Sequence, residues 1–412
     1  MRILFFTENF PPETNAAATR VSERARHWIA AGHQVTIITC APNFPRGTLF
    51  PGWKNRWRQV ETRDGMRVVR VKTFIARNER VVLRTLDFLS FMVTGFTAAL
   101  FERRPDIVVS TSPQFFAAVG AWALAAVRRL PYVFELGDLW PRSIIAVGAM
   151  RPSLALRLVE RLELFLYRRA VAVVALTHAF KDDLVRRGIA AEKIFVVLNG
   201  VEPELYGPRP RDATLAAQTG IGDRFTVGYV GTHGMAHALG KVLEAAALLQ
   251  SEARIRFLFA GPGAERERLI VEAKRRRLTN VVFLDPQPKE RMPEVWSLCN
   301  VALVHLRDLP EFAEVIPSKI FEAMGMGLPI LIAAPRGEAT RLVEDEGAGI
   351  AVAPEDPAAL AAAVRRLAAD SGFRESLAKS SLAAAPRHSR AHQAEAMMAV
   401  FDSVLQARRA VN

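Results

Sequence analysis

Short apolar segments alternate with amphipathic helical segments along the chain, and this alternation is interrupted once, near residue 200. The first series opens with RILFF at residues 2–6 and closes with KIFVV at 193–197. The second opens with FTVGYV at 225–230 and closes with GIAVA at 349–353. Strands that alternate with helices form a parallel, doubly wound sheet, because each helix carries the chain back across the sheet. The sequence therefore predicts two Rossmann-like α/β domains.

The interruption, NGVEPELYGPRPRD at residues 199–212, is rich in proline and glycine and is typical of a linker. We therefore expect an N-terminal domain at 1–207 and a C-terminal domain at 208–385. A helix at 386–412 is expected to pack back on the first domain. Ligands of doubly wound sheets bind beyond the carboxyl ends of the strands, so the two domains are expected to face each other across a cleft.

The positive charge of the chain is concentrated in its first half. Residues 1–207 hold 29 Lys and Arg against 18 Asp and Glu, so they carry +11 of the net charge of +13. Such an excess predicts an acidic ligand, an anionic membrane surface or a nucleic acid, and the alternative is a solvated basic surface without a partner. Nucleic acid is disfavoured, because no zinc-finger, basic-zipper or RNP-type aromatic motif accompanies the arginines.

The cysteines, the N-terminus and the apolar runs exclude several classes of protein. Cys40 and Cys299 are the only cysteines, which excludes a disulfide scaffold and favours a reducing compartment. The N-terminal MRILFFTENFPPE predicts a first strand, not a signal peptide. The apolar runs at 88–101 and 110–127 are too short to span a bilayer and are expected to be buried helices. Residues 77–93 mix arginines with apolar residues, so a helix in a membrane interface is an alternative.

A short helix in EVIPSKIFEAMGMGLPIL, residues 314–331, carries two opposite charges. At 100° per residue Ile320 and Met324 form the buried stripe, while Lys319 and Glu322 lie on the opposite side. Ser318 is the expected N-cap. A solvated face with a weak ion pair is the alternative.

A glycine-rich turn follows the strand FTVGYV and precedes a helix. Gly228, Gly231 and Gly234 surround the end of this strand, where backbone N–H groups can approach an anion. An NAD site would also need an acidic residue at the end of the next strand, which instead ends in Ala260 and Gly261. The pattern therefore disfavours a dehydrogenase.

Together the turn and the helix favour a nucleoside diphosphate as ligand. Backbone dipoles and Lys319 can neutralise the charge that grows on a departing diphosphate, and Glu322 can accept both ribose hydroxyls. No metal ion or other cofactor is then required. The sequence also has no DxD motif and no His/Asp cluster with the spacing of metal ligands.

Over nearly its whole length, the chain resembles the family-4 glycosyltransferases of the GT-B fold. The resemblance is carried by FPPETNAAATR, GHQVTIIT, KIFVVLNGV, YVGTHG, FAGPGAERERL and PSKIFEAMGMGLPIL. It implies that a sugar is transferred from a nucleotide donor, with UDP expected, and with retention at the anomeric carbon. The family's two glutamates, separated by seven residues, match Glu314 and Glu322. The resemblance assigns the ribose to Glu322 and a hydroxyl of the donor sugar to Glu314.

The chain also departs from the family pattern. An Arg and a Lys usually follow the YVG turn, and Thr232 and His237 stand in their places. Lys319, with His233 and Arg307, is therefore expected to contact the diphosphate. The complete expected nucleotide-sugar site is Gly231, Thr232, His233, Gly234, His237, Arg307, Pro317, Ser318, Lys319 and Glu322.

The acceptor side is expected in the first domain. Asn15, Ala16 and Ala17 replace the usual glycine pair of the first loop. In ELGDLWPRS, Glu135 and Asp138 are expected to address sugar hydroxyls or the acceptor, and the alternative for Asp138 is a cap of the following turn. The expected catalytic residues are Asp138, Glu135, Glu314 and Lys319. These features resemble the WbuB-type subgroup of surface-polysaccharide enzymes, which implies an N-acetylated amino sugar or a deoxy sugar in the donor.

The predicted function is that of a metal-independent retaining glycosyltransferase with a polysaccharide or lipid-linked saccharide acceptor. We expect it in the cytoplasm, peripherally attached to the inner face of the cytoplasmic membrane. The arginines expected to make this attachment are Arg77, Arg80, Arg84, Arg103 and Arg104. The alternatives are a sugar-nucleotide epimerase on the same fold and a non-catalytic basic protein that binds membrane or nucleic acid.

Overall fold

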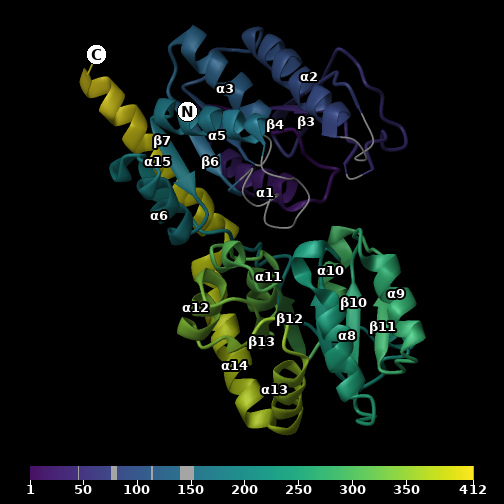
Figure 1. Cartoon of the computed structure of the whole chain (residues 1–412). Helices are drawn as coiled ribbons and strands as arrows, with labels where there is room; N and C mark the ends of the chain where they lie inside the picture. The colour runs from purple at the N-terminus through teal and green to yellow at the C-terminus, as the bar shows by residue number, and fades with distance from the viewer. Residues whose placement is uncertain (45, 76–80, 113–114, 140–152, 412) are drawn as a thin grey trace. The chain divides into compact units, whose positions relative to one another are not determined.

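The computed structural model describes residues 1–44, 46–75, 81–112, 115–139 and 153–411. The chain forms two compact units, one of Met1–Leu198 with Arg390–Asn412 and one of Asn199–Ser389 (Figure 1). The boundaries between the two units differ from the expected ones. The first boundary comes after residue 198 and not after 207. The second comes after residue 389 and not after 385.

The first unit contains an eight-stranded sheet with the order β3-β4-β2-β1-β5-β6-β7-β8. Its strands are β1 (Arg2–Phe6), β2 (Gln34–Cys40), β3 (Arg58–Arg63), β4 (Met66–Val71), β5 (Ile107–Thr111), β6 (Tyr132–Leu136), β7 (Ala172–Ala175) and β8 (Ile194–Val196). All strand pairs are parallel except β3 with β4. The predicted doubly wound sheet is thus confirmed.

The hairpin of β3 and β4 was not predicted. Its turn consists of Asp64 and Gly65, whose φ angles are 49° and 77°. An Asp-Gly pair is a strong hairpin signal, because both central residues of such a turn need positive φ. The hairpin was missed because β3, RQVETR, lies at the sheet edge and has no buried residue, so its sequence lacks the apolar pattern of a strand.

Helices cover both faces of this sheet. They are α1 (Ala16–Ala30), α2 (Val81–Leu100), α3 (Phe115–Arg128), α5 (Leu154–Arg169), α6 (His178–Arg186) and α15 (Arg390–Val411). The C-terminal α15 lies along α1 (Figure 1). The indole of Trp28 on α1 donates to the carbonyl of Ala394 at 3.1 Å, and its ring lies 5.5 Å from that of Phe401. The last helix therefore completes the core of the first unit.

The two apolar runs of the first unit differ in burial. Most of the apolar side chains of α3 are buried, as expected. In α2 the window Leu83–Leu100 has a mean hydropathy of 1.2 and is only 28% buried. Among the described residues, α2 is the one helix long and apolar enough to span a membrane, by length and composition alone. The run that begins at residue 88 is therefore helical, as expected, but only part of it is buried.

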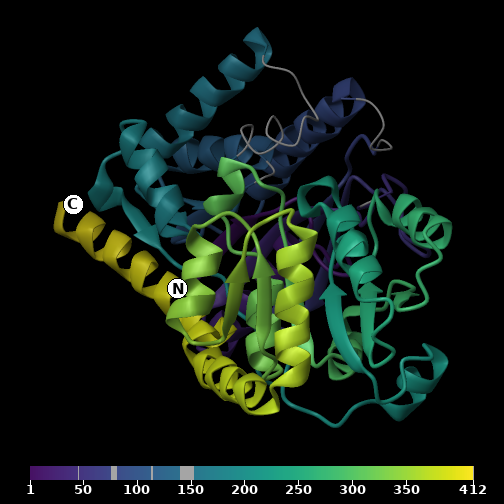
Figure 2. The ribbon, with the colours of Figure 1, turned by 60° about the horizontal axis from the view of Figure 1, so that its bottom comes forward.

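The second unit contains a six-stranded, fully parallel sheet with the order β11-β10-β9-β12-β13-β14 (Figure 2). Its strands are β9 (Phe225–Val230), β10 (Ile255–Ala260), β11 (Val281–Leu284), β12 (Val301–His305), β13 (Ile330–Ala333) and β14 (Gly349–Val352). Its helices are α7 (Ala213–Gln218), α8 (Leu239–Leu248), α9 (Arg266–Arg275), α10 (Met292–Ser297), α11 (Lys319–Gly325), α12 (Glu338–Asp345), α13 (Pro357–Ala369) and α14 (Ser371–Ala384).

The order of strands reverses between β9 and β12 in the second unit, which pair although β10 and β11 separate them in sequence. Such a switch point is where doubly wound sheets bind ligands, because the connections leave in opposite directions there. The glycine turn follows β9, and the segment that leads to α11 follows β12. The fold therefore brings the two predicted parts of the nucleotide site to the same edge of one sheet.

Candidate functional site

Lys319 is the first residue of α11 and is buried, with 7% of its surface exposed. Ile320 and Met324, on the predicted apolar stripe, are fully buried. The alternative of a solvated face is therefore wrong for Lys319. Ser318 is the N-cap residue of α11, as expected, but its backbone is helical and its side chain makes no capping hydrogen bond to any described residue.

The ammonium of Lys319 lies against an aromatic ring. Its Nζ is 3.6 Å from the centroid of the Tyr229 ring and has no hydrogen-bond partner among the described residues. Burial lowers the pKa of Lys319 to about 7, although the carboxylate of Glu322 acts in the opposite direction. A cation that rests only on the face of a π system retains three unused donors. The arrangement is therefore suited to receive an anion.

Gly231 makes this position of the lysine possible. Its φ is 141°, and a Cβ at this residue would lie only 2.9 Å from Nζ of Lys319. The turn itself is anchored by Tyr229, whose hydroxyl donates to the carbonyl of Thr232 at 2.8 Å. The same tyrosine thus holds both the glycine turn and the lysine.

His233 is fully buried, and neither of its ring nitrogens has a hydrogen-bond partner in the part of the chain that the structure describes. The ring centroids of three aromatic side chains lie 5.7 to 6.4 Å away: Tyr229, Phe259 and Phe283. Burial, together with the charges of Lys319 and Arg266, lowers the pKa of His233 to about 4. The imidazole is therefore neutral at physiological pH and offers one donor and one acceptor.

His237 and His305 fasten the turn to the end of β12. Nδ1 of His305 is 2.8 Å from the carbonyl oxygen of His237, and Nδ1 of His237 is 3.2 Å from that of His305. Burial lowers the pKa of His237 to about 3 and that of His305 to about 4, so both rings are neutral. The backbone N–H of Arg307 adds a bond to the carbonyl of Ala236 at 2.9 Å. The guanidinium of Arg307 lies 4.0 Å from Glu355.

The two glutamates of the predicted signature have different surroundings. Glu322, on α11, accepts a hydrogen bond from the indole of Trp296 at 3.1 Å and is half-buried. Glu314 is also half-buried and follows the single turn η4 (Pro310–Ala313). Pro317 lies between this turn and α11 and is likewise half-buried.

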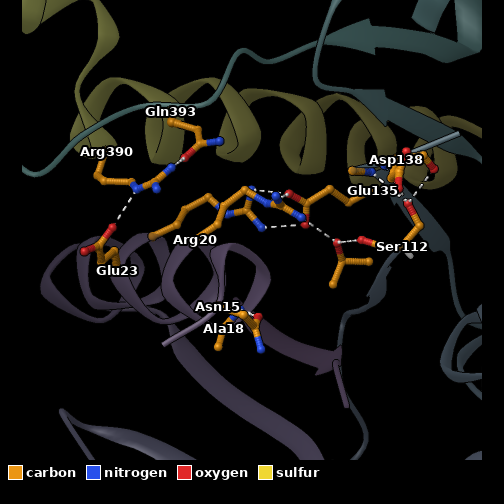
Figure 3. Close-up of polar contacts among 12 residues, drawn as sticks. Asn15, Ala18, Arg20, Glu23, Ser112, Glu135, Asp138, Arg390 and Gln393 are labelled. Atoms are coloured by element: carbon orange, nitrogen blue, oxygen red, sulfur yellow. Dashed lines mark hydrogen bonds and ion pairs between the residues drawn. The ribbon is translucent and has the colours of Figure 1, made fainter. Parts of the chain in front are cut away.

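Glu135, in β6 of the first unit, is fully buried between two arginines (Figure 3). Its carboxylate accepts from Nε of Arg20 at 2.9 Å, and from Nη1 and Nη2 of Arg24 at 2.8 Å each. Burial opposes ionisation, but Arg24 and Arg20 hold the pKa of Glu135 at about 2. The expected catalytic or acceptor role of Glu135 is therefore wrong, because its carboxylate is enclosed and paired by the protein itself.

Asp138 lies in the turn after β6 and is half-buried. Oγ of Ser112 accepts from the backbone N–H of Gly137 at 2.8 Å and of Asp138 at 3.2 Å (Figure 3). The same hydroxyl is 3.3 Å from the carbonyl oxygen of Asp138. The backbone of Asp138 is thus held at the carboxyl ends of β5 and β6. The rest of the expected motif, Trp140 to Ser143, lies outside the described residues.

The residues expected in the first loop, 15–17, lie at the N-terminus of α1. The side chain of Asn15 is the N-cap of α1 and accepts from the backbone N–H of Ala18 at 3.0 Å (Figure 3). Its amide nitrogen is buried and has no hydrogen-bond partner among the residues that the structure describes. Ala16 is exposed and Ala17 is buried.

Sequence reasoning missed three residues that organise the site, Tyr229, His305 and Trp296. Each contacts a predicted site residue from a different element. Trp296 and His305 belong to segments that were predicted only as helix and strand. Among the residues that the structure describes, no three His, Cys, Asp or Glu side chains come together in a way that could hold a metal ion.

Two known glycosyltransferase domains match most of the chain. Residues 15–200 match a glycosyl transferase 4-like domain, and residues 212–382 match the glycosyl transferases group 1. A putative colanic acid biosynthesis glycosyl transferase, WcaI of Escherichia coli, is 25% identical over 89% of this chain and 92% of the relative. The probable glycosyltransferase WbjE of Pseudomonas aeruginosa is 25% identical over 63% of this chain and 65% of the relative.

Solved structures show the same fold. Sucrose-phosphate synthase from Thermosynechococcus elongatus has a TM-score of 0.78 at 19% identity, over 98% of this chain and 99% of that chain. HepE of Anabaena in complex with UDP-glucose has a TM-score of 0.74 at 18% identity, over 98% of this chain and 100% of that chain. The expected fold of two Rossmann-like units, as in these glycosyltransferases, is thereby confirmed.

We expect Glu135→Gln to destabilise the protein by about 3–5 kcal/mol, because two buried guanidinium groups would lose their counter-charge. Urea unfolding followed by circular dichroism measures this effect. The matched control is Asp138→Asn, which changes a half-buried carboxylate of the same strand–turn segment and should cost less than about 1 kcal/mol. A Glu135→Gln variant that is as stable as the wild type but inactive would show that Glu135 takes part in catalysis.

Proposed function

Because the chain belongs to the family-4 glycosyltransferases of the GT-B fold, we propose that it transfers a sugar from UDP to a saccharide acceptor with retention at the anomeric carbon. The observation that carries this proposal is the buried ammonium of Lys319. It lies against the ring of Tyr229 beside the glycine turn, without a hydrogen-bond partner among the described residues. A buried cation is costly unless it is paired, so such a group is suited to an anion that arrives with the substrate.

Each side chain around Lys319 fits one part of a nucleotide sugar. Lys319 would contact the diphosphate and stabilise the charge that grows on it as it departs. The neutral ring of His233 would add one hydrogen bond without adding charge. Glu322, held on the same helix, would accept the ribose hydroxyls, and Glu314 would contact the donor sugar. The HepE structures, solved with UDP and with UDP-glucose, support a uridine nucleotide.

Retention at the anomeric carbon needs no nucleophile from the protein. As the bond from the anomeric carbon to the diphosphate oxygen breaks, the acceptor hydroxyl bonds to that carbon on the same face. The proton of the hydroxyl passes to the departing phosphate oxygen, so charge and atoms balance without a carboxylate pair of the hydrolase type. This account is consistent with Glu135 having an internal role, and it leaves Asp138 to bind the acceptor. It also requires no metal ion.

The acceptor is proposed to be a saccharide of polysaccharide assembly, attached to a lipid. WcaI, which matches 89% of this chain, is named as a putative glycosyl transferase of colanic acid biosynthesis. The surface of α2 supports a location at the membrane, because its side chains Leu86 and Val93 are 46% and 55% exposed. Phe101, directly after the helix, is 79% exposed, and the exposed Arg103 and Arg104 follow it. Apolar side chains next to arginines are suited to an anionic lipid surface.

One arginine expected at the membrane has another partner. The guanidinium of Arg84 lies 3.1 Å from the carboxylate of Asp87 and 4.5 Å from the centroid of the Phe88 ring. Its side chain is only 20% exposed, so the expectation that it faces lipid is wrong. Arg77 and Arg80 lie outside the described residues.

A panel of nucleoside diphosphates tests the proposed function directly. UDP is expected to raise the unfolding temperature more than the other nucleotides, because binding to the native state alone stabilises it. The shift should be the same with and without EDTA. No shift with any nucleotide would refute the donor proposal, and a shift that EDTA abolishes would refute metal independence.

The affinity for UDP is expected to fall as the pH rises from 7 to 9. The pKa of Lys319 is about 7 in the free protein, and a bound diphosphate raises it, so binding takes up a proton in this range. The loss should approach tenfold per pH unit. The other titratable groups that face Lys319 are Glu322, His233, His237 and His305. The three histidines have pKa values of about 3 to 4 and stay neutral across this range.

Isothermal titration calorimetry in two buffers of different ionisation enthalpy measures this proton uptake. Lys319→Arg is the matched control, because a guanidinium stays charged throughout the range and should remove the dependence. A wild-type affinity that is constant from pH 7 to pH 9 would show that Lys319 does not contact the diphosphate.

Flotation with liposomes tests the membrane proposal. The wild-type protein is expected to bind anionic vesicles at low salt and to dissociate from them at high salt. It should not bind neutral vesicles. Replacing both Arg103 and Arg104 by serine should weaken the partition coefficient roughly 30-fold, from about 1 kcal/mol for each charge. Arg254→Ser, an exposed charge in the other unit, is the control. Equal binding to neutral vesicles, or none at low salt, would contradict the proposal.

A further inference from the structure

We infer that Trp296 is a positioning residue that orients the carboxylate of Glu322 and thereby sets the preference of the enzyme for ribonucleotide over deoxyribonucleotide donors. This inference rests on the proposed function, in which Glu322 accepts the ribose hydroxyls. Trp296 belongs to α10 and Glu322 to α11, so the contact joins two helices that are separated in the sequence by β12.

The indole of Trp296 is fixed in place. Trp296 is fully buried in a core cluster of the second unit that also includes Val295 of α10 and Ile320 of α11. Its ring therefore cannot rotate without displacing close-packed neighbours. Its Nε1 donates to Oε2 of Glu322 at 3.1 Å. Because the donor is rigid, it selects one orientation of a carboxylate that is itself only half-buried.

The contact also affects the balance of charge on α11. Lys319 and Glu322 lie three residues apart on this helix, and the carboxylate raises the pKa of the lysine. Nevertheless the ammonium of Lys319 makes no hydrogen bond to Glu322 or to any other described residue. The indole N–H stabilises the ionised carboxylate without neutralising it. The carboxylate of Glu322 therefore has a donor of its own, and the ammonium of Lys319 is left for a second, anionic part of the ligand.

A purely structural explanation is that a buried indole simply needs an acceptor. The two explanations differ in a measurable quantity. A structural role affects the stability of the protein and the affinity for every nucleotide alike. A positioning role affects the discrimination between UDP and its 2′-deoxy and 3′-deoxy analogues, because only the hydroxyl groups report on the orientation of Glu322.

The chain contains a matched control for the loss of an indole hydrogen bond. Trp28, in the first unit, is also buried, and its indole donates to the carbonyl of Ala394 at the same distance of 3.1 Å. Trp28→Phe and Trp296→Phe therefore remove the same donor and a similar amount of packing. Only Trp296 contacts a residue of the proposed nucleotide site.

The experiment compares dissociation constants of the full chain for UDP, 2′-deoxy-UDP and 3′-deoxy-UDP. We expect the wild type to prefer UDP by at least tenfold over one deoxy analogue. Trp296→Phe should reduce this ratio to less than threefold, mainly through weaker binding of UDP. Glu322→Gln should abolish the preference for UDP, so that the ratio falls to about one. Trp28→Phe should leave the ratio unchanged. If Trp296→Phe does not fold, benzothienylalanine at position 296 keeps the shape of the indole and removes only the N–H.

The outcomes separate this inference from the function on which it rests. A wild-type protein that binds none of the three nucleotides contradicts the proposed function. A wild type that binds UDP without preferring it to either analogue overturns the inference and leaves the nucleotide proposal in place. The inference also fails if a folded variant at position 296 keeps the wild-type ratio while Glu322→Gln loses it, since Trp296 is then only a packing residue.

Discussion

The site depends on one costly interaction, a lysine ammonium that is buried against an aromatic ring and has no hydrogen-bond partner in the described part of the chain. Desolvation would drive such a side chain towards its neutral form or out into solvent, and the fold opposes both. Tyr229 offers the negative face of its ring, and Glu322 favours the charged form. Gly231 has no side chain that would collide with Nζ. The glycine turn and the short helix are therefore two parts of one arrangement that leaves a positive charge available to a substrate.

In the first unit, by contrast, several arginines are paired with carboxylates within the protein. Arg20 and Arg24 enclose Glu135, and Arg58 and Arg67 both contact Glu102. Part of the basic excess in residues 1–207 is thus bound within the fold and does not face a partner. Net charge alone overstates the free basic surface, and the proposed contact with lipid depends on the exposed residues that follow α2.

The sequence predicted both sheets, the glycine turn and the short helix of Lys319, because these depend on local periodicity and on the ends of strands. Lys319 and Glu322 could be found from their helical spacing. Tyr229 and Trp296 could not, because their contacts depend on how β9, β12 and their helices meet at the switch point. Glu135 was misjudged for a similar reason. Its partner Arg24 lies 111 residues earlier in the chain, and no local pattern connects the two.

The structure of the protein with UDP bound tests the central claim most directly. We expect Nζ of Lys319 to lie within about 3 Å of a diphosphate oxygen, at the distance of a charge-assisted hydrogen bond. The carboxylate of Glu322 should accept the ribose hydroxyls in the same complex. A complex in which Lys319 stays on the ring of Tyr229, while other groups bind the diphosphate, would contradict the account.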